Sequence, residues 1–425
     1  MDIKISELNE TVMYCLKNVE FYQKILKKVV PNGSISSLEE FQDLPFTDKE
    51  DIKRYYPYGF LGAKLEDISI YNESSGTSGG DANRSSRVAS FSTAKDIELD
   101  LKRRTAGDLK FNKTDIIFNA LPYAFTSSGI NFHLAALEAG AMIIPADNGN
   151  AMSSYRKQID VIRRINPTII LTSYPYIYST LFKMFKVPLE ELTNLRAIQL
   201  CGMASSYEGR NKISKLFNGV PVYNTYGMSE FGAITSTCNC KKSHINKDFY
   251  IEIINPKTLE VMGEGQGGEI VITTLNREGS PKIRYRTGDI GNITCGECEC
   301  GRKTPRLENS GRLKDLLEIN GERFVISDFE NVFYKHAATT GMYKFEYVDE
   351  DKIKITIDVE SEDKLKTATE LKEMIKGELN LDIEFECVDV GQSRKEVLVQ
   401  QNTSLKSLQS IENDKRGEGE WLVTY

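Results

Sequence analysis

The sequence predicts an α/β protein: a large N-terminal body with parallel sheets covered by helices and a β-rich subdomain, followed by a small α+β C-terminal cap. Between about residues 71 and 240, short apolar runs alternate with helical stretches, and beyond about residue 245 Gly-rich turns separate strand-like segments. Strands that are apolar on both faces and alternate with helices favour a parallel sheet covered on both sides. We predict two domains, over residues 1–312 and 313–425.

The N-terminal half supplies the elements of the parallel sheet. Residues 5–26 predict short helices, and LPFTDKEDIKRYYP predicts a turn and a capped helix, with Thr47 before Asp48 and Glu50. Four continuous apolar runs predict buried strands, and two segments between them have helical spacing. The strands are 115–121, 141–146, 168–173 and 195–202, and the helices are 153–166 and 176–186.

In the C-terminal half, strand-like segments joined by Gly-rich turns replace the alternation of apolar runs and helices. FYIEIINP, GEIVITTL and IRYRTGDIGNIT read as strands joined by Gly-rich turns. The stretch GEGQGG (263–268) superficially suggests a dinucleotide loop, but it precedes a strand and no helix follows, so we predict a hairpin turn. Residues 344–360 predict a strand, a polar turn and a strand, and 381–390 another strand. An amphipathic helix over 363–379 places on one face Leu365, Ala368, Leu371, Ile375 and Leu379.

Charge and hydropathy exclude several classes of protein. The 425 residues contain 54 Lys and Arg against 61 Asp and Glu, a net charge of −7. A mildly acidic chain has no global attraction to nucleic acid or anionic membranes. No apolar run reaches the length of a membrane helix, and MDIKISELNE carries charges where a signal peptide is apolar. We therefore expect a cytoplasmic protein without nucleic-acid or membrane partners, as a monomer or a homodimer.

Four segments combine Gly with hydroxyl or charged side chains. They are Tyr71–Gly80, Tyr223–Glu230, Tyr285–Asp289 and Gly311–Gly321. In the first, glycines let backbone N–H groups approach an anion and hydroxyls add donors, so it could hold a triphosphate. It lacks the Gly-Lys-Ser/Thr ending of a P-loop, which makes a Walker-type NTPase a poor interpretation.

In this order and at these separations, the four segments resemble the core motifs of the adenylate-forming superfamily of acyl-CoA synthetases, adenylation domains and luciferases. The chain is most similar to the phenylacetate–CoA ligase and coenzyme F390 synthetase-like branch. That similarity rests on LPFTDKEDIKRYYPYGF, on AMIIPADNGN (141–150) and on a Cys…His…Asp pattern followed by Cys-x-Cys-Gly-Arg. The resemblance extends from about residue 20 to 335.

The resemblance implies a two-step ligase. Such enzymes join a carboxylate to ATP, giving an acyl-adenylate and pyrophosphate, and a thiol then displaces AMP. The thiol can be CoA or the phosphopantetheine of an acyl carrier protein, and the sequence leaves both open. A non-catalytic nucleotide-binding relative is the alternative. The first step brings two anions together, so it needs Mg²⁺ and cationic donors.

The resemblance also implies roles for individual residues. Glu230 is the glutamate associated with Mg²⁺, Asp289 the acceptor for the ribose hydroxyls, and Arg312 the arginine that reaches ribose or phosphate. Tyr226 packs on the adenine, and Asp315 is the hinge of the cap. The phosphate contacts are Ser74, Ser75, Gly76, Thr77, Ser78 and Gly79, with Thr77 counted as catalytic. The nucleotide pocket is completed by Gly202, Met203, Asn224, Gly227, Met228 and Ser229.

The acid pocket follows from the same resemblance. It is lined by Tyr123, Phe125, Ser128, Gly129, Met203 and Gly227. Pockets of this kind are apolar with few polar anchors. The two aromatic side chains favour an aryl acid, although both could equally belong to the core.

Two departures from the family pattern concern charge. The hydroxyl-Gly loop continues with Asp81 where the family usually has Lys, although Arg84 and Arg87 are near. The C-terminal segment that carries the adenylation lysine is shortened, and Lys395 is its candidate. Lys406 and Lys415 are weaker candidates.

The eight cysteines predict a metal site. Close spacing in a cytosolic chain points to metal more than to disulfides. One Cys–His pair and one Cys pair can close a tetrahedral zinc site with no open position, so its role would be structural. The branch resemblance points to Cys238, His244, Cys298 and Cys300, with Cys240 and Cys295 as alternates. For the other two histidines, His133 and His336, packing or surface roles are expected.

Overall fold

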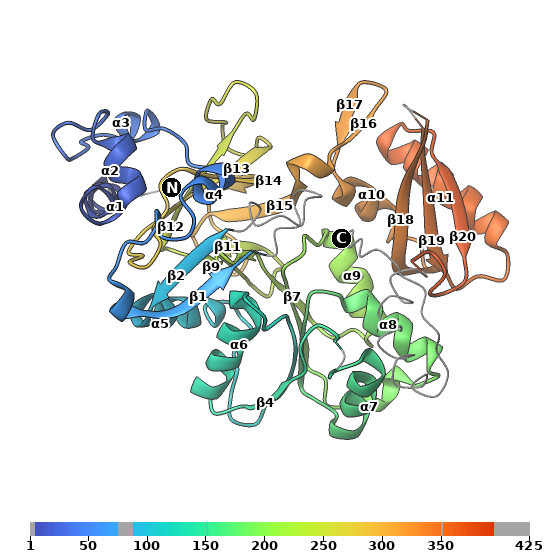
Figure 1. Ribbon diagram of the computed structural model, residues 1–425. Coiled ribbons are helices and arrows are strands. Elements are labelled where there is room, and N and C mark those ends of the chain that lie inside the picture. Colours follow the sequence, from blue (N-terminus) through green and yellow to red (C-terminus); the bar gives the residue numbers. More distant parts are fainter. Residues whose placement is uncertain (1–4, 75–87, 151, 350–351, 395–425) are drawn as a thin grey trace, which may run out of the picture. The chain divides into compact units, whose positions relative to one another are not determined.

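The computed structural model describes residues 5–74, 88–150, 152–349 and 352–394 (Figure 1). The chain forms two compact units, each made of separate chain segments. Unit 1 contains Met1–Lys113, Pro122–Gly140 and Tyr223–Asp315; unit 2 contains Thr114–Leu121, Ala141–Val222 and Leu316–Tyr425. The predicted domains, 1–312 and 313–425, divide the chain differently and stay a prediction. Among the described residues, no helix is both long and apolar enough to cross a bilayer.

Short, well-capped helices open unit 1. In α4 the Asp48 carboxylate accepts the N–H groups of Glu50 and Asp51, and the Asp51 side chain accepts the N–H of Asp48. The cap is therefore Asp48, while the Thr47 hydroxyl donates to the Ile283 carbonyl. The helices of unit 1 are α1 (Ile5–Asn18), α2 (Glu20–Leu26), α3 (Leu38–Gln42), α4 (Lys49–Arg54), α5 (Ala94–Arg104) and α6 (Ser127–Glu138), with short 3₁₀ turns at Leu65–Asp67 and Leu313–Asp315.

A six-stranded antiparallel sheet forms the body of unit 1, in the order β10-β11-β15-β14-β13-β12. Its strands are β10 (Thr235–Thr237), β11 (Ser243–Ile245), β12 (Phe249–Ile254), β13 (Gly268–Thr274), β14 (Tyr285–Thr294) and β15 (Arg306–Arg312). Two further pairs belong to this unit: β1 (Ile68–Glu73) with β2 (Ala89–Thr93), and β8 (Gly227–Met228) with β9 (Gly232–Ala233). Residues 255–267 connect β12 to its antiparallel partner β13, and the stretch 263–268 forms the end of this connection and the first residue of β13. The stretch thus leads into a strand of an antiparallel pair, as the sequence predicts, and no helix directly follows it.

Unit 2 contains the predicted parallel sheet. The strand order is β4-β3-β5-β6-β7, and β3, β4, β5 and β6 pair in parallel. Side chains of α7, α8 and α9 share a core with those of β3, β5 and β6. The strands are β3 (Ile116–Ala120), β4 (Met142–Pro145), β5 (Ile169–Thr172), β6 (Ala197–Cys201) and β7 (Val222–Thr225), and the helices are α7 (Tyr155–Ile165), α8 (Pro175–Met184) and α9 (Tyr207–Leu216), with a 3₁₀ turn at Leu189–Glu191. The four apolar runs are thus the strands that the sequence predicts.

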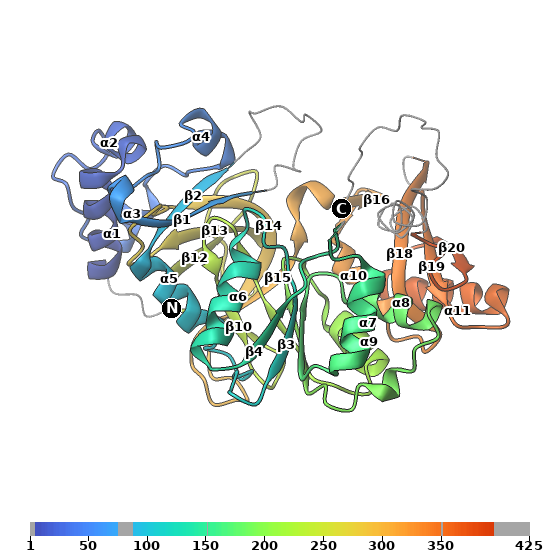
Figure 2. The same cartoon turned by 60° about the horizontal axis from the view of Figure 1, so that its bottom comes forward.

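The rest of unit 2 is a smaller α+β assembly in which α11 packs on a three-stranded sheet (Figure 2). Its elements are β16 (Leu317–Ile319), β17 (Glu322–Phe324), α10 (Ile326–Phe333), β18 (Thr339–Asp349), β19 (Lys352–Val359), α11 (Lys364–Leu379) and β20 (Glu384–Val388). Leu371 and Ile375 are buried as expected, but Leu365 is 84% exposed and Thr367 takes the buried place in the first turn. The α/β class is confirmed.

Candidate active site and metal site

Glu230 lies in the tight turn between β8 and β9. Gly227 pairs with Ala233 and Met228 with Gly232, so the strands are joined by a turn over 229–231. Gly232 has φ +75°, and a Cβ there would lie 2.3 Å from Asp100 Oδ1, so only glycine fits. The Glu230 side chain is buried, with Tyr285 OH 3.4 Å from its Oε1. The sequence motif therefore becomes a rigid turn that presents one carboxylate.

A β-bulge in β14 positions Asp289. Arg286 pairs with Val271 and Ile290 pairs with Glu269, so three residues on β14 oppose one on β13. The bulge residue Gly288 has φ +73°. The extra residues break the alternation of the strand and redirect the side chain, as bulges commonly do beside functional sites.

Asp289 is the centre of a polar cluster. Tyr226 donates its hydroxyl to Asp289 Oδ2 at 2.7 Å, and Arg312 Nε lies 3.7 Å from Oδ1. Asp289 and Arg312 are direct partners across β14 and β15. Burial raises the pKa of Asp289, while the Tyr226 hydroxyl and the Arg312 guanidinium favour its ionised form. Burial likewise raises the pKa of Tyr226 well above its ordinary value, which keeps it a donor. The structure brings together three residues that the sequence assigns to the ribose, phosphate and adenine.

The residues predicted for the rest of the nucleotide pocket have distinct surroundings. Asn224 Oδ1 is buried and accepts no hydrogen bond from the described residues. Gly202 follows β6 with φ +92°, and a Cβ there would lie 3.1 Å from Ser173 Oγ. Met203 is 52% exposed. The adenine-pocket assignment of these three residues stays a prediction.

Side chains predicted to hold the acid lie at the start of α6 and before it. Tyr123 OH is 3.1 Å from His133 Nδ1, and the two rings meet edge to face. Phe125 has φ +58° and is 67% exposed, and its carbonyl accepts the Glu73 N–H. Ser128 Oγ lies 3.2 Å from Thr126 Oγ1, and the Gly129 N–H donates to the Pro122 carbonyl. His133, expected to be a packing or surface residue, is a direct partner of the Tyr123 hydroxyl.

Some predicted residues lie outside the described part of the chain. They are Ser75, Gly76, Thr77, Ser78, Gly79, Asp81, Arg84, Arg87, Lys395, Lys406 and Lys415. Ser74 lies at the edge of this stretch, where its N–H donates to the Val88 carbonyl.

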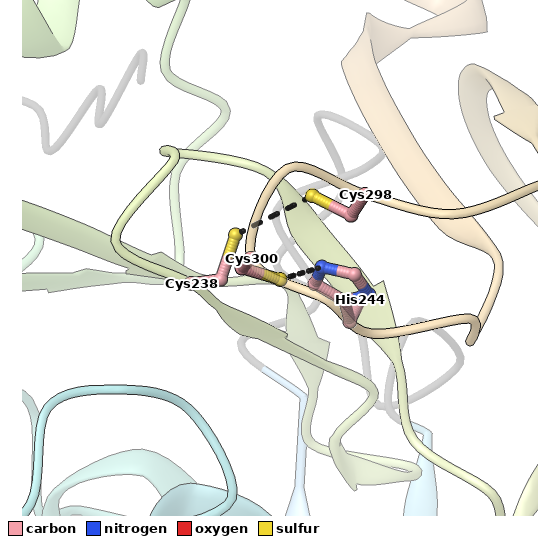
Figure 3. Close-up of side chains that lie close together, drawn as sticks. All are labelled: Cys238, His244, Cys298 and Cys300. Carbon is pink, nitrogen blue, oxygen red and sulfur yellow. Dashed lines mark hydrogen bonds between the residues drawn. The ribbon is translucent and has the colours of Figure 1, made fainter.

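The predicted zinc ligands converge on one point (Figure 3). One Sγ or ring-nitrogen atom each from Cys238, His244, Cys298 and Cys300 lies within 4.8 Å of the other three. The closest pairs are Cys238 Sγ–Cys298 Sγ at 4.0 Å and Cys300 Sγ–His244 Nε2 at 3.4 Å. Ligand atoms around a tetrahedral zinc ion at the usual bond lengths are about 3.5–3.8 Å apart. The donor set and its spacing fit zinc.

Two turns of matching geometry carry the cysteines. The Cys238 N–H donates to the Lys242 carbonyl and the Lys241 N–H to the Cys238 carbonyl. In the second turn, the Cys298 N–H donates to the Arg302 carbonyl and the Gly301 N–H to the Cys298 carbonyl. Lys241 and Gly301 both have positive φ, of 60° and 81°. Cys240 holds the place in its turn that Cys300 holds in the other, but the fourth member of the cluster is His244.

The sheet explains why a histidine completes the cluster. His244 lies on β11, opposite Ser236 on β10 and Arg306 on β15, so the strand places its ring beside the second turn. His244 Nδ1 lies 2.8 Å from Thr304 Oγ1 and 3.1 Å from the Thr304 carbonyl. A partner on Nδ1 leaves Nε2 free of a proton and able to bind metal.

Sequence reasoning assigned no role to several residues around these sites. Asp108 accepts the Asn239 N–H at 2.6 Å and pairs with Arg302, so it ties the two cysteine turns together. Tyr285 belongs to the Tyr285–Asp289 motif. Its contact with Glu230 cannot be predicted from the spacing of the motifs, because 55 residues separate the two side chains along the chain. Arg277, Arg103 and Asp100 contact the Glu230 hairpin.

Known proteins are similar to this chain in sequence or in fold. The family of AMP-binding enzymes matches residues 89–276. A phenylacetate-coenzyme A ligase of Aromatoleum evansii is 26% identical over 90% of this chain and 86% of its own. A phenylacetate-coenzyme A ligase of Thermus thermophilus is 29% identical over 74% of this chain and 70% of its own. The structure of 2-hydroxyisobutyryl-CoA ligase with R3-HIB-AMP, in the postadenylation state, has a TM-score of 0.79 at 20% identity and covers 95% of this chain and 91% of that one.

The sequence relatives and the solved structure each match most of the chain, and the ordered motifs contribute the contacts of Glu230 and Asp289. The chain is thus similar over most of its length to phenylacetate-coenzyme A ligases, and residues 89–276 match the family of AMP-binding enzymes, in agreement with the resemblance that the ordered motifs carry.

Proposed function

We propose that this protein is an AMP-forming acid–thiol ligase that converts a carboxylic acid, ATP and CoA into an acyl-CoA, AMP and pyrophosphate. The observation that carries this proposal is the cluster of Tyr226, Asp289 and Arg312 with Glu230 in the same unit. The match to named ligases over most of the chain supports it.

In the first step, a carboxylate oxygen of the acid attacks the α-phosphorus of ATP. The P–O bond to pyrophosphate breaks, and the acyl-adenylate forms. Both reactants are anionic, so cations must offset their charge. Arg312 supplies a guanidinium beside Asp289, whose carboxylate is placed to accept the ribose hydroxyls. The orphaned Asn224 Oδ1 suits the amino group of adenine, which supports its place in the nucleotide pocket.

Glu230 is our proposed ligand for Mg²⁺. The ion would offset phosphate charge during adenylation. A carboxylate is the ligand type that Mg²⁺ prefers. Among the described residues, only Tyr285 donates a hydrogen bond to this carboxylate, at 3.4 Å from Oε1. Glu230 Oε2 therefore has no competing donor in that part of the chain.

In the second step, a thiol attacks the acyl carbon and AMP leaves. CoA is favoured over a carrier-protein phosphopantetheine because the matching relatives are named as coenzyme A ligases. An aryl acid is favoured because their named substrate is phenylacetate and because Tyr123 and His133 form an aromatic pair beside the predicted pocket. Acid-dependent exchange of labelled pyrophosphate into ATP, with phenylacetate, benzoates and short aliphatic acids, tests the proposal. Absence of exchange with every acid would contradict it.

We also propose that Cys238, His244, Cys298 and Cys300 hold a structural zinc ion. The ion would join the β10–β11 turn to the β14–β15 connection, about 60 residues apart. With four protein ligands it has no open position for a substrate. It would thus stabilise the end of the β14–β15 pair at Thr294 and Arg306, while Asp289 and Arg312 pair at the other end.

Removing the proposed ribose acceptor should weaken nucleotide binding. We expect Asp289→Asn to raise the KM for ATP about 10- to 100-fold, because one or two charge-assisted hydrogen bonds are lost. Tyr226→Phe removes only the donor to Asp289, so its increase should be smaller. The KM for CoA, measured with preformed acyl-adenylate, should stay near the wild-type value in both variants. An equal rise in the KM values for ATP and CoA would contradict the ribose assignment.

The predicted adenylation lysine can be tested by separating the half-reactions. Lys395→Ala should lower acid-dependent pyrophosphate exchange by about 100-fold, since a cation beside the reacting phosphate is lost. Thioester formation from synthetic acyl-adenylate and CoA should continue at close to the wild-type rate. Lys406→Ala and Lys415→Ala are the matched controls. Unchanged exchange in Lys395→Ala would remove this residue from the mechanism.

A further inference from the structure

The turn that carries Glu230 is held from behind by buried side chains of other elements. The hairpin itself is short: β8 and β9 contribute two residues each, and the Phe231 N–H donates to the Met228 carbonyl. Two-stranded hairpins are marginal by themselves. The position of the Glu230 carboxylate therefore depends on contacts outside the hairpin.

Arg277 makes the most extensive of these contacts. It follows β13 and is 7% exposed. Nη1 donates to the Phe231 carbonyl at 3.3 Å, and Nη2 donates to Ser90 Oγ and Ser92 Oγ, both at 3.2 Å. Ser90 in turn donates to the Glu230 carbonyl at 3.3 Å. One guanidinium thus joins the turn to β2, directly through the Phe231 carbonyl and, by way of Ser90, through the Glu230 carbonyl.

A second attachment comes from α5. Arg103 Nη1 donates to the same Phe231 carbonyl at 3.2 Å, and Asp100 Oδ1 accepts the Ala233 N–H at 2.6 Å. Burial disfavours the charge on Asp100, but Arg104 and Arg103 outweigh it and hold its pKa below the ordinary value. Gly232 lets the chain pass against this carboxylate. The hairpin is fixed on both sides of Glu230.

The buried charged groups behind the hairpin are expected to contribute little to the free energy of folding. Burial lowers the pKa of Arg277, which shows that the site is costly for a charge. Replacing such buried ionic groups by apolar ones is often neutral or stabilising. Their geometry instead serves precision, because a displacement of about 1 Å in a catalytic group can cost about 100-fold in rate.

We propose that Arg277 is a positioning residue that, through Ser90 and the Phe231 carbonyl, holds the Glu230 carboxylate where it binds the divalent cation of the adenylation step. This inference rests on the proposed function and on the role of Glu230. It implies that Ser90, Arg103 and Asp100, which lie outside the sequence motifs, also help to position the Glu230 hairpin.

Two serines on β2 give a matched test. Ser90 and Ser92 both accept from Arg277 at 3.2 Å and both are buried, but only Ser90 also donates to the Glu230 carbonyl. Ser90→Ala should raise the Mg²⁺ concentration for half-maximal pyrophosphate exchange about three- to tenfold, as expected for a lost hydrogen bond. Ser92→Ala should stay within about twofold. Arg277→Lys keeps the charge but not the forked geometry, so we expect a shift of about tenfold or more.

Two readouts do not depend on turnover. Binding of Mn²⁺ in the presence of ATP, followed by electron paramagnetic resonance, should weaken in the same order: Arg277→Lys, then Ser90→Ala, then Ser92→Ala. Amide hydrogen exchange should accelerate at Phe231 and Ala233 in the first two variants and stay slow in β13. The thermal unfolding of each variant is recorded alongside.

The outcomes separate the two claims. The inference is overturned if Arg277→Lys lowers the unfolding temperature but leaves Mn²⁺ affinity and Mg²⁺ dependence at wild-type values, or if Ser90→Ala and Ser92→Ala behave alike. If the wild type exchanges no pyrophosphate with any acid, the proposed function fails. Ordered shifts in Mn²⁺ binding and hydrogen exchange would still support the positioning role in that case.

Discussion

Glu230→Gln should lower acid-dependent pyrophosphate exchange by about 10²- to 10³-fold, the usual loss when one preorganised electrostatic contact is removed from a reacting centre. The amide keeps the shape of the side chain and an oxygen that can accept from Tyr285, whose hydroxyl lies 3.4 Å from Glu230 Oε1. It loses the negative charge that a divalent cation requires. The deficit should therefore appear in adenylation and in Mg²⁺ dependence, with little change in the fold.

Two controls sharpen this expectation. Glu230→Asp keeps the charge on a shorter side chain and should regain part of the rate at high Mg²⁺. Thioester formation from synthetic acyl-adenylate should proceed in Glu230→Gln at nearly the wild-type rate, because that step transfers no phosphoryl group. If both half-reactions fall equally, or if exchange is unaffected, Glu230 is not the metal-associated carboxylate.

Cys298→Ser should abolish zinc binding and lower the first thermal unfolding transition by roughly 10 °C, the shift expected from a loss of several kcal/mol. The thiolate is one of four ligands, of which three lie on two turns and His244 lies on β11, so its loss opens the connection between β14 and β15. Metal analysis by plasma mass spectrometry and calorimetry measure both effects. Adenylation should fall less than in Glu230→Gln, since Asp289 and Arg312 keep their strand pairing.

Cys240→Ser and Cys295→Ser are the matched controls for this change. Both cysteines lie in or beside the same turns, and neither belongs to the converging set of ligand atoms. They should retain one zinc per chain and the wild-type transition. Loss of zinc from Cys240→Ser with retention in Cys298→Ser would reverse the ligand assignment. A zinc-free wild type after growth with added zinc would contradict the site itself.

Periodicity predicted the parallel sheet well because its signal is local. The runs that became β3, β5 and β6 are apolar over consecutive residues and are buried along nearly their whole length, as expected for strands covered on both faces. The run that became β4 is equally apolar, but its ends are exposed. Helical spacing was less reliable at the ends of elements. Leu365 fits the apolar face of α11 by spacing, yet it is 84% exposed, and Thr367 takes the buried position in that turn.

The sequence identified residue types at the candidate sites but not their partners. It left Cys240 and Cys295 open beside the four proposed zinc ligands, since spacing along the chain does not say which side of a turn faces a neighbour. Pairing of β11 with β10 and β15 brings His244, the histidine that the resemblance implies, to the cluster. The contacts of Arg277 with Ser90 and Phe231 join segments that are 187 and 46 residues away.

The sequence by itself predicted the fold class, the resemblance to a branch of the adenylate-forming superfamily, and Glu230, Asp289, Arg312 and the cysteine motifs as candidate site residues, because these predictions depend on local patterns and on the order of motifs. Only the tertiary structure decided which of these side chains meet. The bulge that turns Asp289 toward Tyr226 and the buried arginines behind Glu230 arise from pairing between distant segments. Such pairing is fixed by packing and backbone hydrogen bonding across the whole unit, which no local pattern encodes.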